Sequence, residues 1–179
     1  MLDNKHKDTK LDQAIIIFPN VVSSIICDEI VNTYRDTELW EDSHFYSKEQ
    51  GIRTCNEIRI PVSESDTAIF NVVTECLSEY NKVFMTTATT DEGYTLLRYR
   101  EDQCITDHMD DTTGLGRVLS CSILLNDDFT GGEFSFWGGE KIISPKKGSV
   151  VMFPSNFMYP HKILPVKDGT RYSIITWLK

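Results

Sequence analysis

Two histidines and an aspartate in the C-terminal half of the chain have the residue types of a metal site. His108 and Asp110 are separated by a single residue, and His161 follows farther along the chain. Two imidazoles and one carboxylate can bind one face of a ferrous ion and leave three coordination positions open for a co-substrate and O2. These residues therefore indicate a mononuclear iron centre that activates oxygen.

The alternation of side chains along a β-strand gives a physical reason for this spacing. Side chains two residues apart in an extended strand point to the same face, so His108 and Asp110 can converge on one ion while Met109 points away. Asp107 and Asp111 flank the pair and could compete for the metal. The parity of the strand favours Asp110 over both.

A second pair of residues with the same spacing predicts an anion site. Arg171 and Ser173 lie two positions apart and share one face of a predicted strand. A guanidinium offers a planar fork of donors to a carboxylate, and the neighbouring hydroxyl adds one more, which suits a small dicarboxylate better than a lysine would. We therefore interpret Arg171 and Ser173 as a clamp for an acid.

Short motifs in a fixed order surround these residues. They are Leu96-Leu97-Arg98-Tyr99, the strand from Arg117 to Asn126, Gly131-Gly132-Glu133, Pro145-Lys146-Lys147-Gly148, Val150 to Pro154, His161 to Val166 and Gly169 to Ile174. With this set, the region from about Tyr94 to Lys179 resembles the Fe(II)- and 2-oxoglutarate-dependent dioxygenases, and most closely their prolyl 4-hydroxylase-like branch. The ordered set carries the resemblance, because a bare His-x-Asp occurs by chance.

The resemblance implies roles for five residues. His108, Asp110 and His161 would be the iron ligands and the catalytic centre. Arg171 would bind the distal carboxylate of 2-oxoglutarate, and Tyr99 would form a hydrogen bond with the same co-substrate. The implied reaction converts 2-oxoglutarate and O2 to succinate and CO2 and hydroxylates a C–H bond, with ascorbate as a further expected cofactor. Because Asp110 is present, a halogenase, which needs that position vacated for chloride, is disfavoured.

The resemblance also implies residues on the substrate side. Arg117 and Trp177 stand where prolyl hydroxylases place residues that line the substrate groove, and Trp177 shares strand parity with Arg171. Collagen-type enzymes usually have lysine at the Arg171 position, and many have a tyrosine three residues before the first histidine, where this chain has Ile105. The substrate stays open between a prolyl or other side chain in a peptide and a free small molecule such as an amino acid. A non-catalytic jelly-roll binding module is the remaining alternative.

The length and charge of the chain limit its class and its partners. A chain of 179 residues is ordinary for one domain and long enough to bury about 70% of the surface of the unfolded chain. The net charge of −9 and a pI near 4.9 disfavour a broad phosphate-binding surface, which needs clustered Lys and Arg. The longest basic cluster is Lys146-Lys147, so we expect no nucleic-acid partner, and nucleic-acid demethylation is a weak alternative.

The cysteines and the N-terminal residues bear on the cellular compartment. The five cysteines form no CxxC pair, so they indicate neither a zinc site nor a disulfide framework. Met1 to Asp12 is polar, and no run approaches the ~18 to 20 apolar residues of a membrane span. We therefore expect a soluble cytoplasmic protein with no membrane partner, of the small size that bacterial and phage-encoded members have. The sequence leaves the oligomeric state open.

The N-terminal half should supply support for the site. Residues 14–18 form a short apolar run that predicts a buried strand. A helix should follow after Ser23 or Ser24 as the cap, with an apolar stripe at helical spacing made by Ile26, Cys27, Ile30, Val31 and Tyr34. Residues 40–54 are polar and predict a loop that borders the active site, and residues 56–60 alternate as a short strand.

The longest predicted helix follows Ser63 or Ser65 as its cap. Its apolar residues recur at intervals of three and four and are Ile69, Val72, Val73, Cys76, Leu77, Tyr80, Val83 and Phe84. Such a wide apolar face predicts that the helix packs across one sheet.

From Gly93 onward, short β-rich runs alternate with turns. The runs are 94–100, 117–126, 133–136, 140–144, 149–153, 160–165 and 170–178. This rhythm predicts a mainly β fold, a jelly roll or double-stranded β-helix, with the N-terminal helices packed on one sheet. We expect a single domain over residues 1–179, made of a polar tail (1–12), a support region (13–92) and a jelly-roll core (93–179). Asp111 to Gly116 should form a mobile loop beside the metal.

Overall fold

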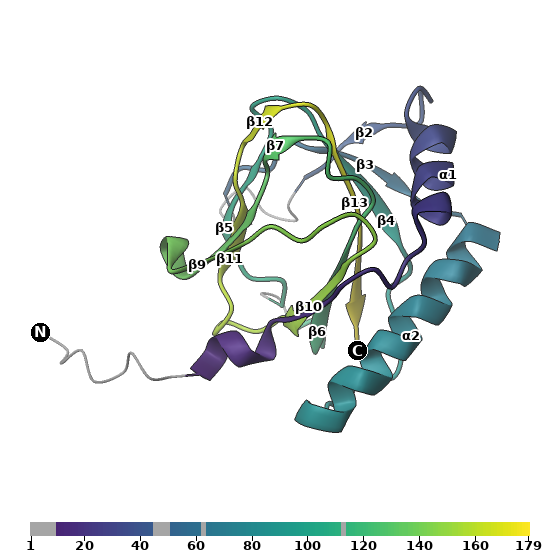
Figure 1. Cartoon of the computed structure of the whole chain (residues 1–179). Coiled ribbons are helices and arrows are strands. Elements are labelled where there is room, and N and C mark those ends of the chain that lie inside the picture. Colours follow the sequence, from purple (N-terminus) through teal and green to yellow (C-terminus); the bar gives the residue numbers. More distant parts are fainter. Residues whose placement is uncertain (1–9, 45–50, 62–63, 112–113) are drawn as a thin grey trace, which may run out of the picture.

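Two antiparallel sheets face each other, and two helices cover the outer face of the larger sheet (Figure 1). The computed structural model describes residues 10–44, 51–61, 64–111 and 114–179. The larger sheet contains, in spatial order, β1 (Ile16–Phe18), β10 (Val150–Pro154), β6 (Leu119–Leu124), β13 (Arg171–Leu178), β4 (Thr95–Tyr99), β3 (Asn56–Arg59) and β2 (Glu41–Asp42).

The smaller sheet carries the strands nearest the predicted metal site. It contains β5 (Ile105–His108), β11 (His161–Ile163), β8 (Phe134–Phe136) and β9 (Lys141–Ile143), and β12 (Val166–Asp168) pairs with β7 (Thr130–Gly131) beside it. The helices are α1 (Ser24–Tyr34) and α2 (Glu64–Phe84), with short 3-10 turns at Lys10–Ala14 and Trp137–Gly139. The four-stranded and seven-stranded sheets together form the two walls of a sandwich (Figure 1).

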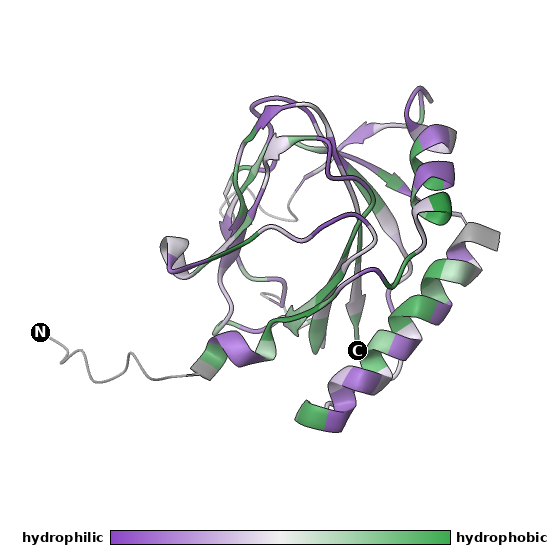
Figure 2. Cartoon of the chain, viewed as in Figure 1, coloured by the Kyte–Doolittle hydropathy of each residue, from purple (hydrophilic) through white to green (hydrophobic). Residues whose placement is uncertain are grey.

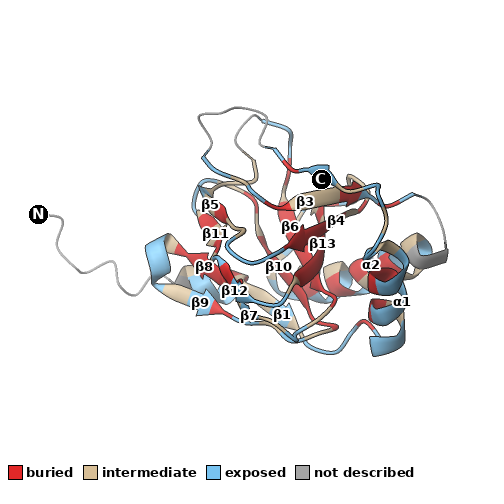
Figure 3. Ribbon diagram, turned by 90° about the horizontal axis from the view of Figure 1, so that it is seen from above, coloured by how far each residue is buried: buried red, intermediate tan, exposed pale blue. Residues whose placement is uncertain are grey.

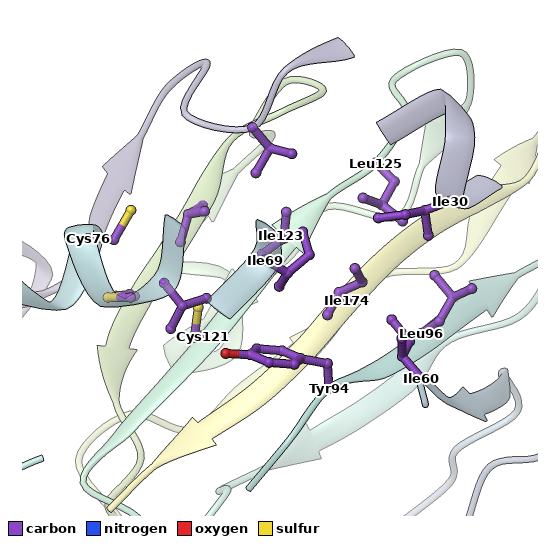
Figure 4. Packing of buried hydrophobic residues seen from close by; sticks show 14 of the residues in the cluster. Ile30, Ile60, Ile69, Cys76, Tyr94, Leu96, Cys121, Ile123, Leu125 and Ile174 are labelled. Carbon is purple, nitrogen blue, oxygen red and sulfur yellow. The ribbon is translucent and has the colours of Figure 1, made fainter. Parts of the chain in front are cut away.

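Successive side chains of each strand point to opposite faces of the larger sheet, and both faces pack into a buried apolar cluster. On the outer face, Cys121, Ile123 and Ile174 pack against Ile69 and Cys76 of α2 (Figure 4). Seen from above, the central strands are buried while the outer surfaces of both helices are exposed (Figure 3). Along both helices hydrophobic and hydrophilic residues alternate (Figure 2), as an amphipathic helix on a sheet requires.

The inner face of the larger sheet meets the smaller sheet in a second buried cluster. Its members include Leu97, Tyr99, Leu124, Val151 and Phe153 from the larger sheet and Phe134, Phe136, Ile105 and Ile163 from the smaller one. On β13 this inner face also carries Arg171 and Ser173, and both are buried. The space between the sheets is therefore mostly apolar, with buried polar side chains near the predicted site.

The predicted architecture is confirmed, since the chain is mainly β and its N-terminal helices pack on one sheet of a double-stranded β-helix. The helix α1 follows Ser23, whose Oγ accepts a hydrogen bond from the N–H of Ile26 at 3.3 Å. For α2, Ser63 lies outside the described residues, and Ser65 lies within the helix and not before it.

Three local predictions were wrong. Residues 14–18 do not form a buried strand, because β1 is an edge strand that pairs with β10 alone and leaves Ile17 39% exposed. Val83 is 65% exposed, although the next residue, Phe84, packs against the core. The predicted loop 40–54 contains β2, which pairs with β3; residues 45–50 of it lie outside the described part of the chain.

The strands β5, β7 and β12 were not among the predicted runs. In the predicted loop from Asp111 to Gly116, residues 112 and 113 lie outside the described residues, and the same is true of residues 1–9 of the predicted tail. Of the helices that the structure describes, none combines the length and the apolar character needed to cross a bilayer.

Candidate metal and co-substrate site

The two predicted histidine ligands lie directly opposite each other on neighbouring strands. His108 ends β5 and His161 begins β11, and the two are register partners with ring centroids 4.3 Å apart. The Nε2 atom of His108 is 3.3 Å from Asp110 Oδ1, and that of His161 is 3.7 Å from Asp110 Oδ2. One donor atom of each residue lies within 4.8 Å of the others. A single ion can therefore be shared by all three side chains.

The hydrogen bonds of both imidazoles leave Nε2 turned toward Asp110. His108 Nδ1 is 2.9 Å from the carbonyl oxygen of Thr106, and His161 Nδ1 is 3.1 Å from that of Tyr159. A proton on each Nδ1 satisfies these carbonyls and leaves the Nε2 lone pair for a metal. Burial, together with the neighbouring His108, lowers the pKa of His161 to about 4. The imidazole of His161 is therefore neutral near pH 7, as metal binding requires.

Asp110 reaches the site in a way that strand parity did not predict. The strand β5 ends at His108, and Asp110 lies in a bend beyond it. Burial alone would raise the pKa of the Asp110 carboxyl, but the imidazoles of His161 and His108 and the hydroxyl of Ser120 outweigh burial and hold that pKa below its usual range. Asp110 is thus an anion beside the two imidazoles, although the strand geometry that we expected to aim it is absent.

The flanking aspartates do not join the three donors. Asp107 is exposed, and its Oδ2 accepts a hydrogen bond from Lys162 Nζ at 2.9 Å. The group of donor atoms that the described residues bring together contains neither Asp107 nor Asp111. Of the three aspartates, Asp110 alone therefore lies with the two histidines in this group of donors.

Arg171 is a buried cation with unused donors. Its side chain is 1% exposed, and its Nη1 donates to Ser173 Oγ at 2.7 Å. Within the described part of the chain, its Nε and Nη2 have no hydrogen-bond partner. Unpaired donors on a buried charge are costly, so this guanidinium fits an anion that enters from the cavity. Gly132 makes room for it, because a Cβ at Gly132 would lie 2.9 Å from Arg171 Cδ.

Tyr99 lies opposite Arg171 in the pairing of β4 with β13. Its ring centroid is 5.0 Å from Arg171 Cζ. Burial, followed by the nearby Cys55, raises the pKa of Tyr99 well above its ordinary value. The phenol is therefore protonated near pH 7 and can donate a hydrogen bond toward the anion that Arg171 would bind.

One cavity connects the metal donors to the buried guanidinium. The predicted residues that line it are His108, Asp110, His161, Tyr99, Arg171, Ser173 and Trp177. A metal and a small acid bound together would thus be neighbours.

The 2OG-Fe(II) oxygenase superfamily has a family model that matches residues 94–179, the part of the chain that contains all of these groups. Residues 94–179 belong to this superfamily. Three metal donors and a buried guanidinium in one cavity are the kinds of group that iron and 2-oxoglutarate would need.

Among curated proteins of known sequence, the chain is similar to a PKHD-type hydroxylase of Idiomarina loihiensis, with 31% identity over 48% of this chain and 41% of that protein. It is also similar to human procollagen-lysine,2-oxoglutarate 5-dioxygenase 2, with 27% identity over 90% of this chain and 23% of that protein. The chain therefore spans less than half the length of these two relatives.

Solved structures share the fold at low identity. A Pseudomonas putida prolyl-4-hydroxylase has a TM-score of 0.76 at 18% identity, covering 93% of this chain and 92% of that one. A Trichoplax adhaerens prolyl hydroxylase, in complex with a peptide fragment of hypoxia inducible factor, has a TM-score of 0.74 at 17% identity, covering 92% of this chain and 83% of that one. A viral collagen prolyl hydroxylase from Paramecium Bursaria Chlorella virus-1, in its 2OG complex, has a TM-score of 0.71 at 20% identity, covering 92% of this chain and 94% of that one.

Within this oxygenase fold, the two predicted substrate residues lie in different settings. Trp177 lines the cavity, whereas Arg117 is absent from its lining. Arg117 donates from Nε and Nη2 to the two carboxylate oxygens of Glu92, at 3.0 and 2.6 Å, and from Nη1 to the carbonyl oxygen of Asp110 at 3.0 Å. Its guanidinium also lies over the ring of Trp177. A role in a substrate groove stays a prediction for Arg117, whose donors are already engaged.

Sequence reasoning missed three polar residues beside the ligands. Ser120 and Ser122 on β6 and Arg53, just before β3, line the same cavity. The run Leu119 to Leu124 alternates apolar residues with these two serines, and this pattern could have predicted a polar inner face. Arg53 has no comparable local signal, because it reaches the site through its pairing with Ile105, far along the chain.

Proposed function

We propose that this chain is an Fe(II)- and 2-oxoglutarate-dependent dioxygenase that hydroxylates a C–H bond in a peptide side chain and releases succinate and CO2. The observation that carries the proposal is the shared cavity, where three metal donors and a buried guanidinium with two unpaired nitrogens lie together. A carbohydrate- or protein-binding jelly roll would have no use for such a costly cation in its core.

The three metal donors, Arg171 and Ser173 each have a defined task in this proposal. His108 and His161 present neutral Nε2 atoms and Asp110 a carboxylate, so together they would hold Fe(II) with one unit of negative charge. Bound iron would supply the redox chemistry that activates O2. Arg171, with Ser173 beside it, would hold the distal carboxylate of 2-oxoglutarate through a charge-assisted fork.

The apolar residues of the cavity would keep water out and fix the orientation of the co-substrate. Phe134, Phe153 and Ile163 line it from both sheets. A closed apolar wall strengthens the electrostatic contacts of the bound acid and favours one orientation. The co-substrate would then occupy the interior, and the primary substrate would approach from the open side.

A peptide is the proposed substrate because the surroundings of the metal donors favour a large partner. The connection from β10 to β11 runs directly into His161, and it carries Phe157, 76% exposed, and Met158, 41% exposed. Exposed apolar side chains beside a site are typical of surfaces that bind other chains. Similarity to prolyl hydroxylases, one of them solved with a peptide, adds support for a prolyl side chain as the first candidate. Trp177, which lines the cavity, would contact that side chain.

The proposal is tested by succinate release from 2-oxoglutarate in the presence of O2, with and without Fe(II) and ascorbate. We expect slow release that requires Fe(II) and is abolished in His161→Ala, because one of three ligands is gone. Proline-containing peptides, lysine-containing peptides and free amino acids are then added in parallel. Stimulation by a peptide is the expected result. Stimulation by free amino acids alone would contradict the peptide substrate, and release without Fe(II) would contradict the oxygenase.

A further inference from the structure

The carboxylate ligand is the one member of the triad that β-sheet pairing does not hold. His108 and His161 are register partners at the ends of their strands, whereas Asp110 lies beyond the end of β5 in a bend. A carboxylate on an unpaired segment can rotate and shift, and metal ligands usually depend on neighbouring hydrogen bonds for their orientation. The structure must therefore position Asp110 by other contacts.

Two buried serines supply such a contact to the Asp110 side chain. Ser120 Oγ donates to Asp110 Oδ2 at 2.5 Å, and Ser120 Oγ lies 2.8 Å from Ser155 Oγ. Ser120 is 3% exposed and Ser155 1% exposed. Because the carboxylate can only accept, the proton of Ser120 goes to Asp110 and the proton of Ser155 goes to Ser120. The two hydroxyls thus form a directed chain that ends on the metal ligand.

The main chain around Asp110 is held at the same place. The N–H of Asp111 donates to the carbonyl oxygen of Ser155 at 3.0 Å, and the N–H of Ser155 donates to the carbonyl oxygen of Val118 at 3.1 Å. Arg117 Nη1 donates to the carbonyl oxygen of Asp110 at 3.0 Å. The end of β10 and the start of β6 therefore replace the missing strand partner.

We propose that Ser120, supported by Ser155, is a positioning residue that sets the rotation of the Asp110 carboxylate for metal binding. The hydrogen bond occupies a lone pair of Oδ2 and turns Oδ1 toward the side of His108, from whose Nε2 it lies 3.3 Å. This inference rests on the metal site of the proposed function and adds residues that act through Asp110.

The same strand offers a matched control. Ser122 is two residues from Ser120 on β6, lines the same cavity and is 4% exposed. In the part of the chain that the structure describes, its Oγ has no hydrogen-bond partner. Ser120→Ala and Ser122→Ala therefore remove the same atom from the same face of the same strand. The contact with Asp110 is the relevant difference between them.

The experiment is a titration of the metal-free full chain with Co(II), in the absence of 2-oxoglutarate, followed by the visible absorption of the bound ion. We expect Ser120→Ala to weaken Co(II) binding about 10- to 100-fold, the usual effect of losing an outer partner of a metal ligand, and to change the band shape. Ser120→Thr, which keeps the hydroxyl, should restore both, and Ser122→Ala should match the wild type. Melting temperatures of the metal-free proteins report whether each variant folds.

Equal Co(II) affinity in the wild type and Ser120→Ala would overturn the inference, and so would an equal loss in Ser122→Ala. If Ser120→Ala does not fold, Ser155→Ala decides, because it leaves the direct contact in place but removes its support. A several-fold weaker affinity is expected there, and an unchanged affinity would count against the inference. A wild-type chain that binds no Co(II) would instead overturn the proposed function on which the inference rests.

Discussion

Arg171 and Asp110 contribute opposite charges to one cavity, and the chain positions them in different ways. Arg171 lies in β13 opposite Tyr99, and Ser173 is paired on both sides, with Leu97 and with Leu124. Asp110 lies outside any strand and depends on side-chain contacts. The cation is thus positioned by the backbone ladder, whereas the anion is positioned by a hydrogen-bond network. Variants that affect one arrangement should leave the other intact.

The largest expected effect is on metal binding at Asp110, the anionic end of the cavity. Asp110→Asn keeps the shape of the ligand but removes its charge, so Co(II) affinity should fall by more than about 100-fold, which is the largest usual effect of losing a residue that only supports a metal ligand. The fold should persist, because the cavity keeps its volume. A Co(II) titration and a thermal melt measure the two quantities. An Asp110→Asn variant that binds Co(II) as tightly as the wild type would remove Asp110 from the metal site.

The next effect is at Arg171, the cationic end of the cavity, and should be confined to the binding of 2-oxoglutarate. Arg171→Ala should raise the 2-oxoglutarate requirement at least about tenfold, because a charge-assisted contact of about 1.5 to 3 kcal/mol is lost. Co(II) affinity without 2-oxoglutarate should stay close to the wild-type value. Arg171→Lys is the control, since it keeps the charge and loses the planar fork. An unchanged 2-oxoglutarate requirement in Arg171→Ala would show that the guanidinium does not bind the acid.

The smallest effect concerns the support of the anionic end. Glu92→Gln weakens the contact with Arg117 and should lower the free energy of unfolding by about 1 kcal/mol, a modest value because Glu92 keeps 19% exposure and solvent screens the pair. Burial raises the pKa of Glu92, but the hydrogen bonds and charges of Arg117 and Lys179 outweigh it and lower that pKa below its ordinary 4.5.

The sign of the pH effect follows from this lowered pKa. The stabilising charge of Glu92 is fully present above about pH 4.5 and is lost as the pH falls below that value toward the lower pKa of the folded state. The difference in unfolding free energy between the wild type and Glu92→Gln should therefore be constant at neutral pH and shrink in acid. Urea unfolding at several pH values measures it. A difference that grows in acid would contradict this assignment.

Strand parity predicted the cationic end well because the ladder there is regular. Arg171, Ser173 and Trp177 line one cavity from one face of β13, which is the arrangement that a two-residue period requires. The two helices and most strands from residue 94 onward could be predicted for the same reason, since their apolar residues repeat with the period of the element that contains them. The short strands β5, β7 and β12 were the exceptions.

The anionic end could not be predicted in the same way. Where β5 stops depends on its pairing with β11, and no residue between His108 and Asp110 signals that end. The Ser120 contact requires β6 to lie beside β13 and the end of β10, and sheet order is a long-range property. Local patterns gave the residue types of the site, but the network that holds Asp110 depends on how distant strands meet.

Anaerobic addition of 2-oxoglutarate to the Fe(II)-loaded chain tests the central claim most directly, because it requires the triad and the clamp to act on one ion and one acid. We expect a visible charge-transfer band that needs both Fe(II) and 2-oxoglutarate, is lost in Asp110→Asn, and appears at higher 2-oxoglutarate concentration in Arg171→Ala. A band that neither substitution changes, or no band at all in the wild type, would contradict a metal centre and an acid clamp that share this cavity.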